Sequence, residues 1–428
     1  MQPKIQKILK RLLQLHPKRI DLSLDRIKRL LKDLNNPEKK ITNVIQVVGT
    51  NGKFSVCSTL RQIFETAGYS VNMNISPSLR KFNERYYLSG KNISDKKLYD
   101  LLIEVEKINN NKNITFHEFI CACFFLAASR TKSDINIIES GLFFRLDASN
   151  VFEKNIASIV TPIGIDHKDF LKNGTIDEIV YEKCSHLLNN SKIIIAEQKN
   201  DVLDKIKKNL YKNSSKKYIF GEDYNYKKSI GGFTYADKKV EIQLPSPNLL
   251  GDYQISNVCT AINAVRNLNQ FKITRNDIKT AITKVRSEGR LQIIKHGKLR
   301  KYVSKKNKIL IDGAHNPLAA SVVKKFLKTY RNSKKIVMIL GMMANKDHEE
   351  FIKIFKNEVH SIIALDIPNQ INFLKKEKLS EIAKSYGIPS ETEISIKKAL
   401  KNISKKNEDA LIFCTGSLYF VGEILNLN

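Results

Sequence analysis

Short, almost wholly apolar runs rich in valine and isoleucine alternate with helical segments along most of the chain. Because these runs are continuously apolar, they are typical of strands that are buried on both faces of a sheet. Strands that alternate with helices predict βαβ units, and therefore an α/β fold with mostly parallel sheets. The runs are Val44–Val48, Ile135–Ile138, Ile156–Val160, Ile193–Ala196, Ile309–Asp312, Lys335–Leu340, Ile362–Leu365 and Leu411–Cys414.

The order of these runs divides the 428 residues into two parts. Residues 214–245 carry alternating aromatic and charged side chains and predict a small antiparallel excursion, and residues 251–269 predict a return to helix. Arg286–Arg290 then interrupts the pattern, and a second series of strands follows. We therefore expect a domain of residues 1–292 and a smaller domain of residues 293–428.

The net charge of +30 has three functional readings: a nucleic acid, an anionic membrane surface or a polyanionic substrate. Lysine, asparagine and isoleucine are abundant everywhere, which favours a general compositional bias over one binding patch. No nucleic-acid-binding motif is present, and no apolar run is long enough to span a bilayer. We therefore expect neither a nucleic-acid partner nor a membrane partner. The six cysteines lack metal-ligand spacing, which is typical of a reduced, cytoplasmic protein.

The most specific motif is a phosphate-binding loop, Val47-Val-Gly-Thr-Asn-Gly-Lys-Phe-Ser55. A buried strand ends, a glycine-containing turn follows and a helix begins, so that backbone N–H groups and the helix dipole converge on an anion. Lys53 would neutralise nucleotide phosphates, and Ser55 would offer its hydroxyl to Mg²⁺. The spacing differs from the usual Walker motif, with two residues between the glycines and Phe54 between lysine and serine.

An ordered series of motifs resembles the folylpolyglutamate synthase/dihydrofolate synthase family of the Mur ligase superfamily. The loop resembles the family's Gly-Thr-Asn-Gly-Lys-Gly-Ser signature. Further matches extend from about Asp21 to the C-terminus. They are Ile75–Leu79, Phe82–Arg85, Thr115–Phe119, Glu139–Asn150, Asp166–His167, Glu182–Lys183, Gly251 with Gln254 and Asn257, Gly289–Arg290, Asp312–Pro317 and Gly416–Tyr419.

The resemblance implies an ATP-dependent acid–amino-acid ligase. It would add L-glutamate to dihydropteroate or a reduced folate through an acyl phosphate, as dihydrofolate synthase, folylpolyglutamate synthase (tetrahydrofolate synthase) or both. The implied fold is Mur-ligase-like: an ATP- and pterin-binding domain with a P-loop-type, mostly parallel sheet, followed by a smaller Rossmann-like glutamate ligase domain. A monomer is implied.

The resemblance also implies a Mg²⁺ site and catalytic cations. The metal positions are Ser55, Ser76, Glu139 and His167. Glu139 ends a buried strand, as ligand-binding residues of parallel sheets do, and His167 follows an expected strand over Ile159–Ile165. Lys53 would contact phosphate, and Lys183 matches a lysine that is carbamylated in the family.

The nucleotide and substrate positions follow from the same comparison. Beside the phosphate-loop residues Gly49, Thr50, Asn51, Gly52, Lys53 and Ser55, the adenine contact is Asn257 and the ribose-binding acid is Asp312. Arg290 would reach the ATP phosphates, and His315 would line the same cleft. The pterin positions are Asp21, Leu22, Ser23, Leu24, Thr115, Phe116, His117, Glu118, Leu146, Asp147 and Ala148.

Five positions depart from the family pattern. Phe54 and the pair Phe143–Phe144 replace glycines, Ser78 replaces a histidine and Tyr253 replaces the histidine before Gln254. The two phenylalanines beside the metal position favour an alternative, a divergent amide ligase of the superfamily that joins a different carboxylate and amino acid. A nucleotide- or nucleic-acid-binding protein without ligase activity is the alternative that the net charge and Phe54 favour.

Overall fold

The computed structural model describes residues 3–18 and 20–428, which form two compact units. The first unit contains the residues up to Gly164, residues 175–248 and residues 254–286. The second contains residues 165–174, 249–253 and 287–428. The second unit therefore takes two short segments from the earlier part of the sequence. The expected domain boundary at residues 292 and 293 stays a prediction.

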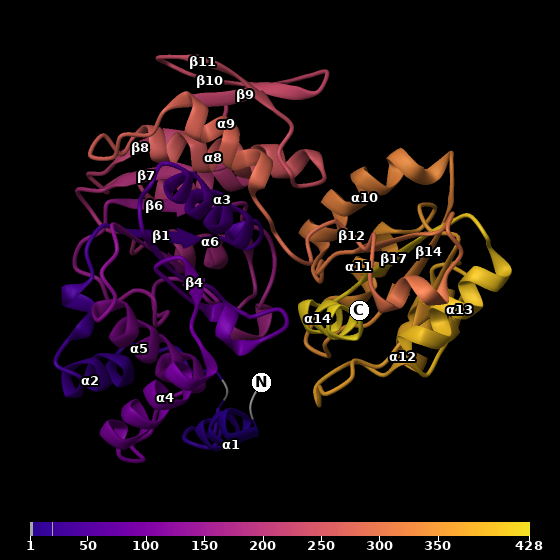
Figure 1. The fold of residues 1–428 in the computed structure, drawn as a ribbon, viewed down its shortest axis with the longest axis horizontal. Coiled ribbons are helices and arrows are strands. Elements are labelled where there is room, and N and C mark those ends of the chain that lie inside the picture. Colours follow the sequence, from indigo (N-terminus) through magenta and orange to yellow (C-terminus); the bar gives the residue numbers. More distant parts are fainter. Residues whose placement is uncertain (1–2, 19) are drawn as a thin grey trace. The chain divides into compact units, whose positions relative to one another are not determined.

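A mostly parallel sheet forms the centre of the first unit (Figure 1). Its order is β4-β3-β2-β5-β1-β6-β7-β8, and only the β2–β3 and β3–β4 pairs are antiparallel. The strands are β1 (Val44–Val48), β2 (Val71–Asn74), β3 (Tyr86–Leu88), β4 (Lys91–Asn92), β5 (Ile135–Glu139), β6 (Ala157–Val160), β7 (Lys192–Ile195) and β8 (Lys216–Ile219). The central strands β1, β5 and β6 are buried at every residue, as their continuous apolar sequences predict.

The helices of this unit pack on the sheet or on one another. They are α1 (Pro3–Leu12), α2 (Asp25–Asp33), α3 (Lys53–Thr66), α4 (Asp95–Asn109), α5 (Phe116–Ser129), α6 (Ile176–Cys184), α7 (Asn200–Asn209), α8 (Asp252–Arg266) and α9 (Arg275–Lys284), with short 3₁₀ turns η1 (Pro37–Lys40) and η2 (Phe82–Arg85). Helix α3 packs on β1, β2 and β5, and α9 packs on α3. The parallel α/β prediction is confirmed.

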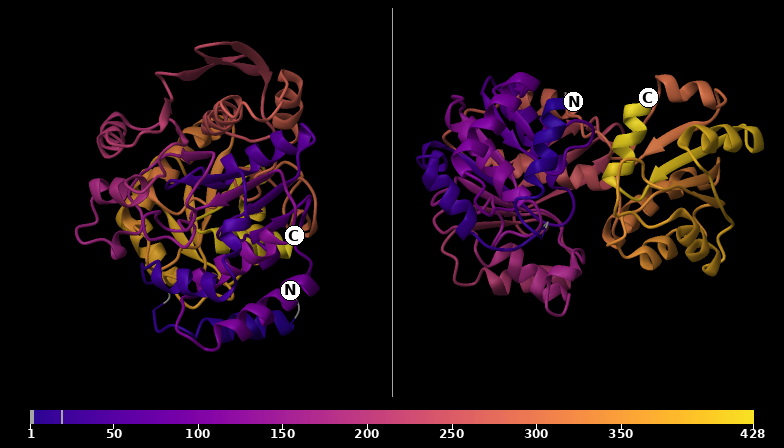
Figure 2. Two further views of the ribbon diagram at one scale, coloured as in Figure 1. Left: turned by 90° about the vertical axis from the view of Figure 1, so that its left-hand side faces the viewer. Right: turned by 90° about the horizontal axis from the view of Figure 1, so that it is seen from below.

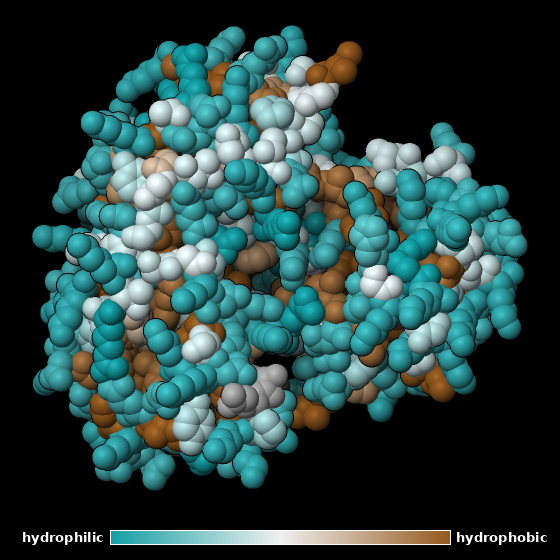
Figure 3. Space-filling model, in the orientation of Figure 1, coloured by the Kyte–Doolittle hydropathy of each residue, from teal (hydrophilic) through white to brown (hydrophobic). Residues whose placement is uncertain are grey.

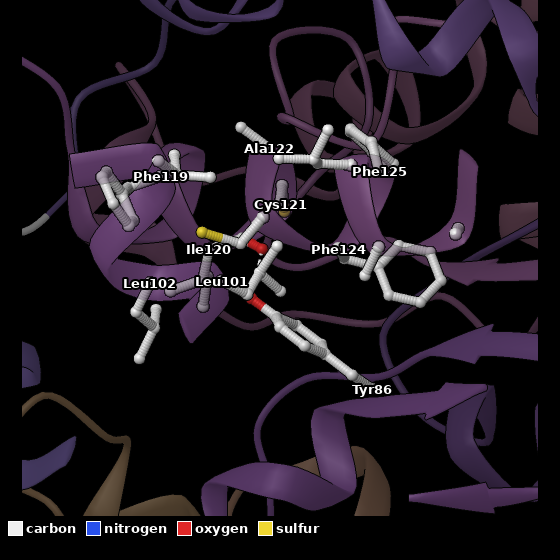
Figure 4. Close-up of a cluster of buried hydrophobic side chains, with 14 of the residues drawn as sticks. Tyr86, Leu101, Leu102, Phe119, Ile120, Cys121, Ala122, Phe124 and Phe125 are labelled. Carbon is white, nitrogen blue, oxygen red and sulfur yellow. Dashed lines mark hydrogen bonds between the residues drawn. The ribbon is translucent and has the colours of Figure 1, made fainter. Parts of the chain in front are cut away.

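An aromatic core lies between α5, its neighbouring helices and β3. Helix α5 begins at a capping box, in which Thr115 and Glu118 bond to each other's backbone N–H groups, and is buried from Glu118 to Ala128. Figure 4 shows Tyr86 directed at α5, where its hydroxyl donates to the carbonyl oxygen of Ile120. Because nearly all sides of α5 are buried, it fixes the position of the segment before it, which carries Thr115.

The antiparallel excursion is shorter than the sequence predicts. Strands β9 (Tyr224–Ser229), β10 (Gly232–Asp237) and β11 (Glu241–Pro245) form a separate antiparallel sheet, which stands out from the unit in Figure 1 and in the left view of Figure 2. Lys216–Ile219, which was expected within the excursion, is β8, a parallel edge strand of the main sheet. The two lysines of β8 hide the apolar pattern that predicts a buried strand. Such residues are accommodated because an edge strand exposes more of its surface than a central one.

The second unit is built on another mostly parallel sheet, with the order β12-β13-β17-β14-β15-β16. Its strands are β12 (Gln292–Ile293), β13 (Lys308–Ile311), β14 (Lys335–Leu340), β15 (Ser361–Ala364), β16 (Ser390–Thr392) and β17 (Ala410–Thr415). Its helices are α10 (Pro317–Arg331), α11 (His348–Ile354), α12 (Lys376–Ser385), α13 (Ile396–Lys406) and α14 (Leu418–Leu427), with 3₁₀ turns η3 (Lys168–Phe170) and η4 (Lys298–Tyr302). Only β12 pairs antiparallel.

Hydrophilic residues cover most of the face seen in Figure 3, with hydrophobic residues scattered among them. The six cysteines are buried free thiols. Over residues 3–18 and 20–428, we find no helix with the length and apolar character needed to cross a membrane.

Candidate functional site

The phosphate loop joins β1 to α3. Gly49 has φ +147° and Gly52, which caps α3, has φ +84°, a region that favours glycine. A Cβ on Gly49 would lie 2.0 Å from Thr161 Oγ1 and 2.7 Å from the Thr161 carbonyl oxygen, so the loop lies directly on the chain that follows β6. The N–H groups of Thr50 and Asn51 donate to the Pro162 carbonyl oxygen at 3.0 and 3.1 Å. The loop is therefore fixed, with the start of α3 presented as an anion site.

Two lysine ammonium groups meet at this loop. Lys53 Nζ donates to the carbonyl oxygens of Gly49 and Thr50 at 3.0 and 3.1 Å. Lys183, on α6 and only 3% exposed, donates to the carbonyl oxygens of Gly49 at 3.0 Å and Leu142 at 2.8 Å. The carbonyl oxygen of Gly49 thus accepts from both cations, which makes the loop strongly electropositive.

Oxygen donors lie beside these cations. Glu139 ends β5 and is 4% exposed, and its Oε2 accepts from the Ser76 N–H at 3.2 Å. Ser55 lies buried in the first turn of α3. Burial and the charge of Glu139 raise the pKa of Cys57 on α3, whereas Lys53 opposes this rise, so the carboxylate and the ammonium group both act on the start of α3. The first unit thus holds three of the four predicted metal positions.

The fourth position, His167, belongs to the second unit. The expected strand over Ile159–Ile165 is wrong, because β6 ends at Val160 and Pro162 and Gly164 follow, residues that disfavour a continued strand. Across residues 3–18 and 20–428, no cluster of three or more His, Cys, Asp or Glu side chains has a metal-holding arrangement. One carboxylate with serine hydroxyls still suits Mg²⁺, which keeps several waters and takes phosphate oxygens.

Asn257 lies against the loop, as a buried residue of α8. A Cβ on Gly52 would lie 2.6 Å from Asn257 Oδ1, and Asn257 Nδ2 donates to Gln254 Oε1 at 3.0 Å. Gln254 is fully buried, and its Nε2 has no hydrogen-bond partner. A buried amide nitrogen that has no hydrogen-bond partner is suited to donate to a ligand that accepts a hydrogen bond.

A second group of predicted residues surrounds the start of α5. His117 Nε2 lies 3.5 Å from Asp147 Oδ2, and a Cβ on Gly141 would lie 2.7 Å from the same nitrogen. Burial alone would lower the pKa of His117, but its interactions with Cys121 and Asp147 outweigh burial and raise that pKa well above its ordinary value. Burial would likewise raise the pKa of Asp147, but His117 and the hydrogen bonds from Ser149 hold it far below its ordinary value.

Asp147 also shapes the turn after β5. Its Oδ2 accepts from the N–H groups of Gly141 and Leu142 at 3.2 and 3.1 Å, and its Oδ1 accepts from Ser149 Oγ at 2.6 Å. Ala148 is buried in the hydrophobic core that contains α5, while Leu146 is half-buried.

Arg26 joins the two predicted pterin segments, and sequence reasoning missed it. Its guanidinium donates to both carboxylate oxygens of Glu118 at 2.9 and 3.0 Å, and to Asp21 Oδ2 at 2.8 Å. Leu22, Ser23 and Leu24, which lie between Asp21 and Arg26 in the sequence, are half-buried. Phe116 packs against Phe82, with ring centroids 6.2 Å apart. The sequence signal that could have indicated Arg26 is its position as the second residue of a helix, shortly after Asp21 and Asp25.

The predicted residues of the second unit gather after β13. Both oxygens of Asp312 accept backbone N–H groups, from Leu291 at 2.8 Å and from Ala314 at 2.7 Å. Burial raises the pKa of Asp312, and the charge of Arg290 opposes that rise. Arg290 lies against Gly313, where a Cβ would be 2.6 Å from its Nη1.

The Asp166 carboxylate binds several polar side chains of the second unit. The family resemblance includes Asp166 among the matched residues but implies no role for it. Its carboxylate accepts from Lys346 Nζ at 2.7 Å and Asn316 Nδ2 at 2.9 Å, and lies 3.5 Å from His315 Nε2. Burial alone would raise its pKa, but the His315 hydrogen bond and the charges of His167, His315 and Lys346 hold that pKa far below its ordinary value. The segment containing His167 is thereby fastened to the loops after β13 and β14.

Comparisons with known proteins agree over the whole length. Residues 47–265 match the Mur ligase middle domain, and residues 290–427 match the C-terminal domain of dihydrofolate synthetase. The dihydrofolate synthase/folylpolyglutamate synthase of Buchnera aphidicola is 30% identical over 427 residues, which cover 98% of this chain and 97% of the relative. The dihydrofolate synthetase of Saccharomyces cerevisiae is 26% identical over 431 residues, covering 96% and 98%.

Solved structures show the same fold. Escherichia coli FolC in complex with DHPP and ADP aligns with a TM-score of 0.88 at 24% identity, covering 99% of this chain and 97% of that one. The Yersinia pestis bifunctional folylpolyglutamate synthase/dihydrofolate synthase complexed with AMPPNP and Mn ion aligns with a TM-score of 0.86 at 21% identity, covering 100% and 98%.

Proposed function

Because this chain belongs to the dihydrofolate synthase/folylpolyglutamate synthase family of the Mur ligase superfamily, we propose that it uses ATP to join L-glutamate to the carboxylate of dihydropteroate, of a reduced folate, or of both. The observation that carries the proposal is the convergence of Lys53 and Lys183 on Gly49, at the start of α3 and in the same unit as Glu139. This arrangement suits a nucleotide polyphosphate. No specific observation favours a different carboxylate, since Phe143 and Phe144 are at most 1% exposed.

The reaction has two displacements. A carboxylate oxygen of the pteroate or folate attacks the γ-phosphorus of ATP, and the bond between that phosphorus and the ADP oxygen breaks. The amino nitrogen of glutamate then attacks the acyl carbon, the bond to the phosphate oxygen breaks, and the nitrogen loses a proton. Such transfer depends on positioning and on neutralising phosphoryl charge. Lys53 and the N–H groups at the start of α3 would supply that neutralisation, with Asn257 beside the nucleotide.

Mg²⁺ fits the donor set of the first unit. Glu139 and the Ser55 hydroxyl would hold it, with Ser76 positioned through its N–H bond to Glu139. When bound, the ion would neutralise phosphate oxygens. His167, which belongs to the second unit, stays a proposed ligand of this ion.

The pterin end would occupy the region of His117, Thr115 and the Asp21–Leu24 segment. The charge on His117 suits an electron-rich heterocycle or carboxylate, and Asp147 and Arg26 would hold the surrounding segments in place. Leu146, Ala148 and Phe116 would add apolar surface.

The second unit would contribute Asp312 to the ribose and Arg290 to the phosphates. His315 and Lys346, both held by Asp166, would provide a basic surface for the carboxylates of glutamate. We further propose that the enzyme acts as a monomer in the cytoplasm, where its buried thiols stay reduced.

The test is ADP release from purified protein with MgATP and L-glutamate, in parallel with dihydropteroate, tetrahydrofolate or neither. Turnover that requires glutamate and dihydropteroate establishes dihydrofolate synthase activity, and turnover with tetrahydrofolate establishes the folylpolyglutamate synthase activity. Binding of ATP without turnover on either substrate would refute the proposed substrates, and failure to bind ATP would refute the ligase assignment.

A further inference from the structure

We propose that Gln46, in the middle of β1, is a positioning residue for the pteroate or folate substrate. It holds the turn of residues 140–149, which follows β5 and carries Asp147, and it acts through that turn rather than by contact with the substrate. Gln46 lies one residue before the phosphate-loop motif, so the family resemblance gives it no role. Its effect on substrate affinity rests on the proposed function, whereas its hydrogen bonds to the turn do not.

A glutamine is unexpected at the centre of this sheet. Strand β1 is paired on both sides, with β5 and with β6, and all of its residues are buried. Gln46 is 0% exposed, between Ile45 and Val47. A buried amide costs free energy unless its N–H and C=O groups form hydrogen bonds. The side chain of Gln46 therefore needs specific partners, whereas valine or isoleucine at this position would need none.

Both ends of the Gln46 amide have a partner. Nε2 donates to the Ser149 carbonyl oxygen at 2.9 Å, and Oε1 accepts from Asn155 Nδ2 at 2.7 Å. Asn155 Nδ2 also donates to the Ser158 hydroxyl at 2.8 Å, and Ser158 is the residue of β6 that pairs with Gln46. Asn155 thus fixes the orientation of the Gln46 amide, so that its N–H group is directed at the turn.

Ser149 connects this attachment to Asp147. The N–H group and the hydroxyl of Ser149 donate to Asp147 Oδ1 at 2.9 and 2.6 Å. The other carboxylate oxygen, Oδ2, lies 3.5 Å from His117 Nε2. Ser149 and Asp147 are both buried, so water has little access to replace these hydrogen bonds. The position of Ser149 therefore determines how the Asp147 carboxylate faces the region proposed for the pterin.

The turn is attached to β1 at both of its ends. At its start, the Ser140 N–H donates to the Val47 carbonyl oxygen at 3.0 Å, and at its end the Ser149 carbonyl oxygen accepts from Gln46. Two adjacent residues of β1 therefore close the turn. The same strand leads into the phosphate loop at Gly49, so β1 positions both the nucleotide-binding loop and the turn that carries the pterin-side carboxylate.

The attachment by Gln46 matters for affinity because a turn that is already ordered does not have to be ordered by the substrate. Without the Gln46 N–H group, the buried Ser149 carbonyl oxygen would lose its donor, and the turn would no longer be held at its end. The phosphate loop is attached separately, to the Pro162 carbonyl oxygen, so ATP binding should be unaffected. A loss of substrate binding alone raises KM and leaves kcat unchanged.

Calorimetry and steady-state kinetics test this role with dihydropteroate, or with tetrahydrofolate if only that substrate supports turnover. Gln46→Met keeps the length of the side chain and removes both hydrogen bonds, so we expect the Kd and KM for this substrate to rise roughly tenfold. The kcat and the KM for ATP should change by less than about twofold. Asn155→Ala removes only the group that orients the amide, and the substrate KM should rise about threefold.

Ser158→Ala is the matched control, because it removes a buried hydrogen bond of the same network without changing a contact to the turn. Its substrate KM should equal that of the wild type. Thermal melts exclude unfolded variants, and if Gln46→Met does not fold, Asn155→Ala is compared with the control instead. Equal substrate KM values in the control and in the variant compared with it would overturn the proposal.

The titration of His117 gives a second reading, which does not depend on turnover. Burial lowers the pKa of His117, and Cys121 and Asp147 raise it. NMR of protein with ¹³C-labelled histidine follows this pKa, and His117→Gln assigns the signal. We expect the pKa to fall towards its ordinary value of 6.5 in Gln46→Met and to stay unchanged in Ser158→Ala. An unchanged titration in Gln46→Met would overturn the connection to Asp147.

The two readings separate this proposal from the proposed function. If neither dihydropteroate nor tetrahydrofolate binds to the wild type, the proposed function fails, and the His117 titration still decides whether Gln46 holds Asp147 in place. If the wild type turns over and Gln46→Met binds the substrate equally tightly, only the role of Gln46 fails.

Discussion

Replacing Arg26 with methionine should separate the two segments that the guanidinium joins. Arg26 bonds to both oxygens of Glu118, a side chain that is 5% exposed, and to Asp21. Removing one partner of a buried ion pair costs about 3–5 kcal/mol, because the other charge is left without compensation. Arg26 is itself 19% exposed, and Thr115 still donates its N–H and hydroxyl to Glu118. We therefore expect the lower end of this range, about 3 kcal/mol.

Hydrogen exchange followed by mass spectrometry localises this cost. Because the chain lacks tryptophan and has two units, a global fluorescence melt would report the change poorly. We expect the amides of α2 and of the start of α5 to lose about a hundredfold in protection, while the second unit is unchanged. The double variant Arg26→Met with Glu118→Gln should regain about half of the loss, since no buried charge remains.

Arg29→Met on the same helix is the matched control. Arg29 pairs with Asp33 at 3.4 Å in an i,i+4 surface contact, which contributes about 0.5 kcal/mol or less. The KM for dihydropteroate should rise in the Arg26 variant and stay unchanged in the control. Equal exchange rates in the two variants would refute the energetic argument, and an unchanged KM would refute the connection between Arg26 and the pterin.

Three further results are expected. Gly49→Ala should abolish ATP binding in calorimetry, because its Cβ would lie 2.0 Å from Thr161 Oγ1 and 2.7 Å from a backbone oxygen; retained affinity would contradict the loop geometry. Chelation of divalent cations should stop ADP release and Mg²⁺ should restore it, with Glu139→Gln raising the Mg²⁺ requirement roughly tenfold or more; an unchanged requirement would exclude Glu139 as a ligand. The His117–Asp147 pair should stabilise the first unit fully between the ordinary pKa values of aspartate, 3.8, and histidine, 6.5. This stabilisation is lost as pH rises through the raised pKa of His117 or falls through the lowered pKa of Asp147. The melting temperature advantage over His117→Gln should therefore shrink at alkaline pH, and a constant advantage from about pH 5 to about pH 9 would refute this coupling.

The fold could be predicted where the sequence pattern is local and strongly apolar. The buried strands β1, β5, β14 and β17 and the helix that follows the phosphate loop lie where the runs of valine and isoleucine indicate. The prediction failed at β8, whose four residues include two lysines at a sheet edge, and at the chain after Val160, where apolar residues continue past the end of β6. Hydrophobic pattern alone distinguishes neither case.

The site was predictable only as a set of positions. The roles of the metal-, nucleotide- and pterin-binding residues were inferred from the family resemblance. For the individual residues these roles remain predictions. Contacts between distant segments had no local signal: Arg26 meets Glu118 across 92 residues, and Lys346 meets Asp166 across 180. Both contacts are made by long cationic side chains in a sequence that contains 73 lysines and arginines, so residue type alone could not single them out.

The glycine substitutions are compatible with an intact phosphate loop, because of where each lies. A glycine is required where φ is positive or where another atom occupies the Cβ position, and both conditions hold at Gly49 and Gly52, which this chain keeps. Phe54 lies in the first turn of α3 with a helical backbone, which any residue except proline adopts readily beyond the first position. The loop therefore keeps its glycines at the two positions that its conformation requires, and Phe54 changes the surface beside the anion site rather than the path of the backbone.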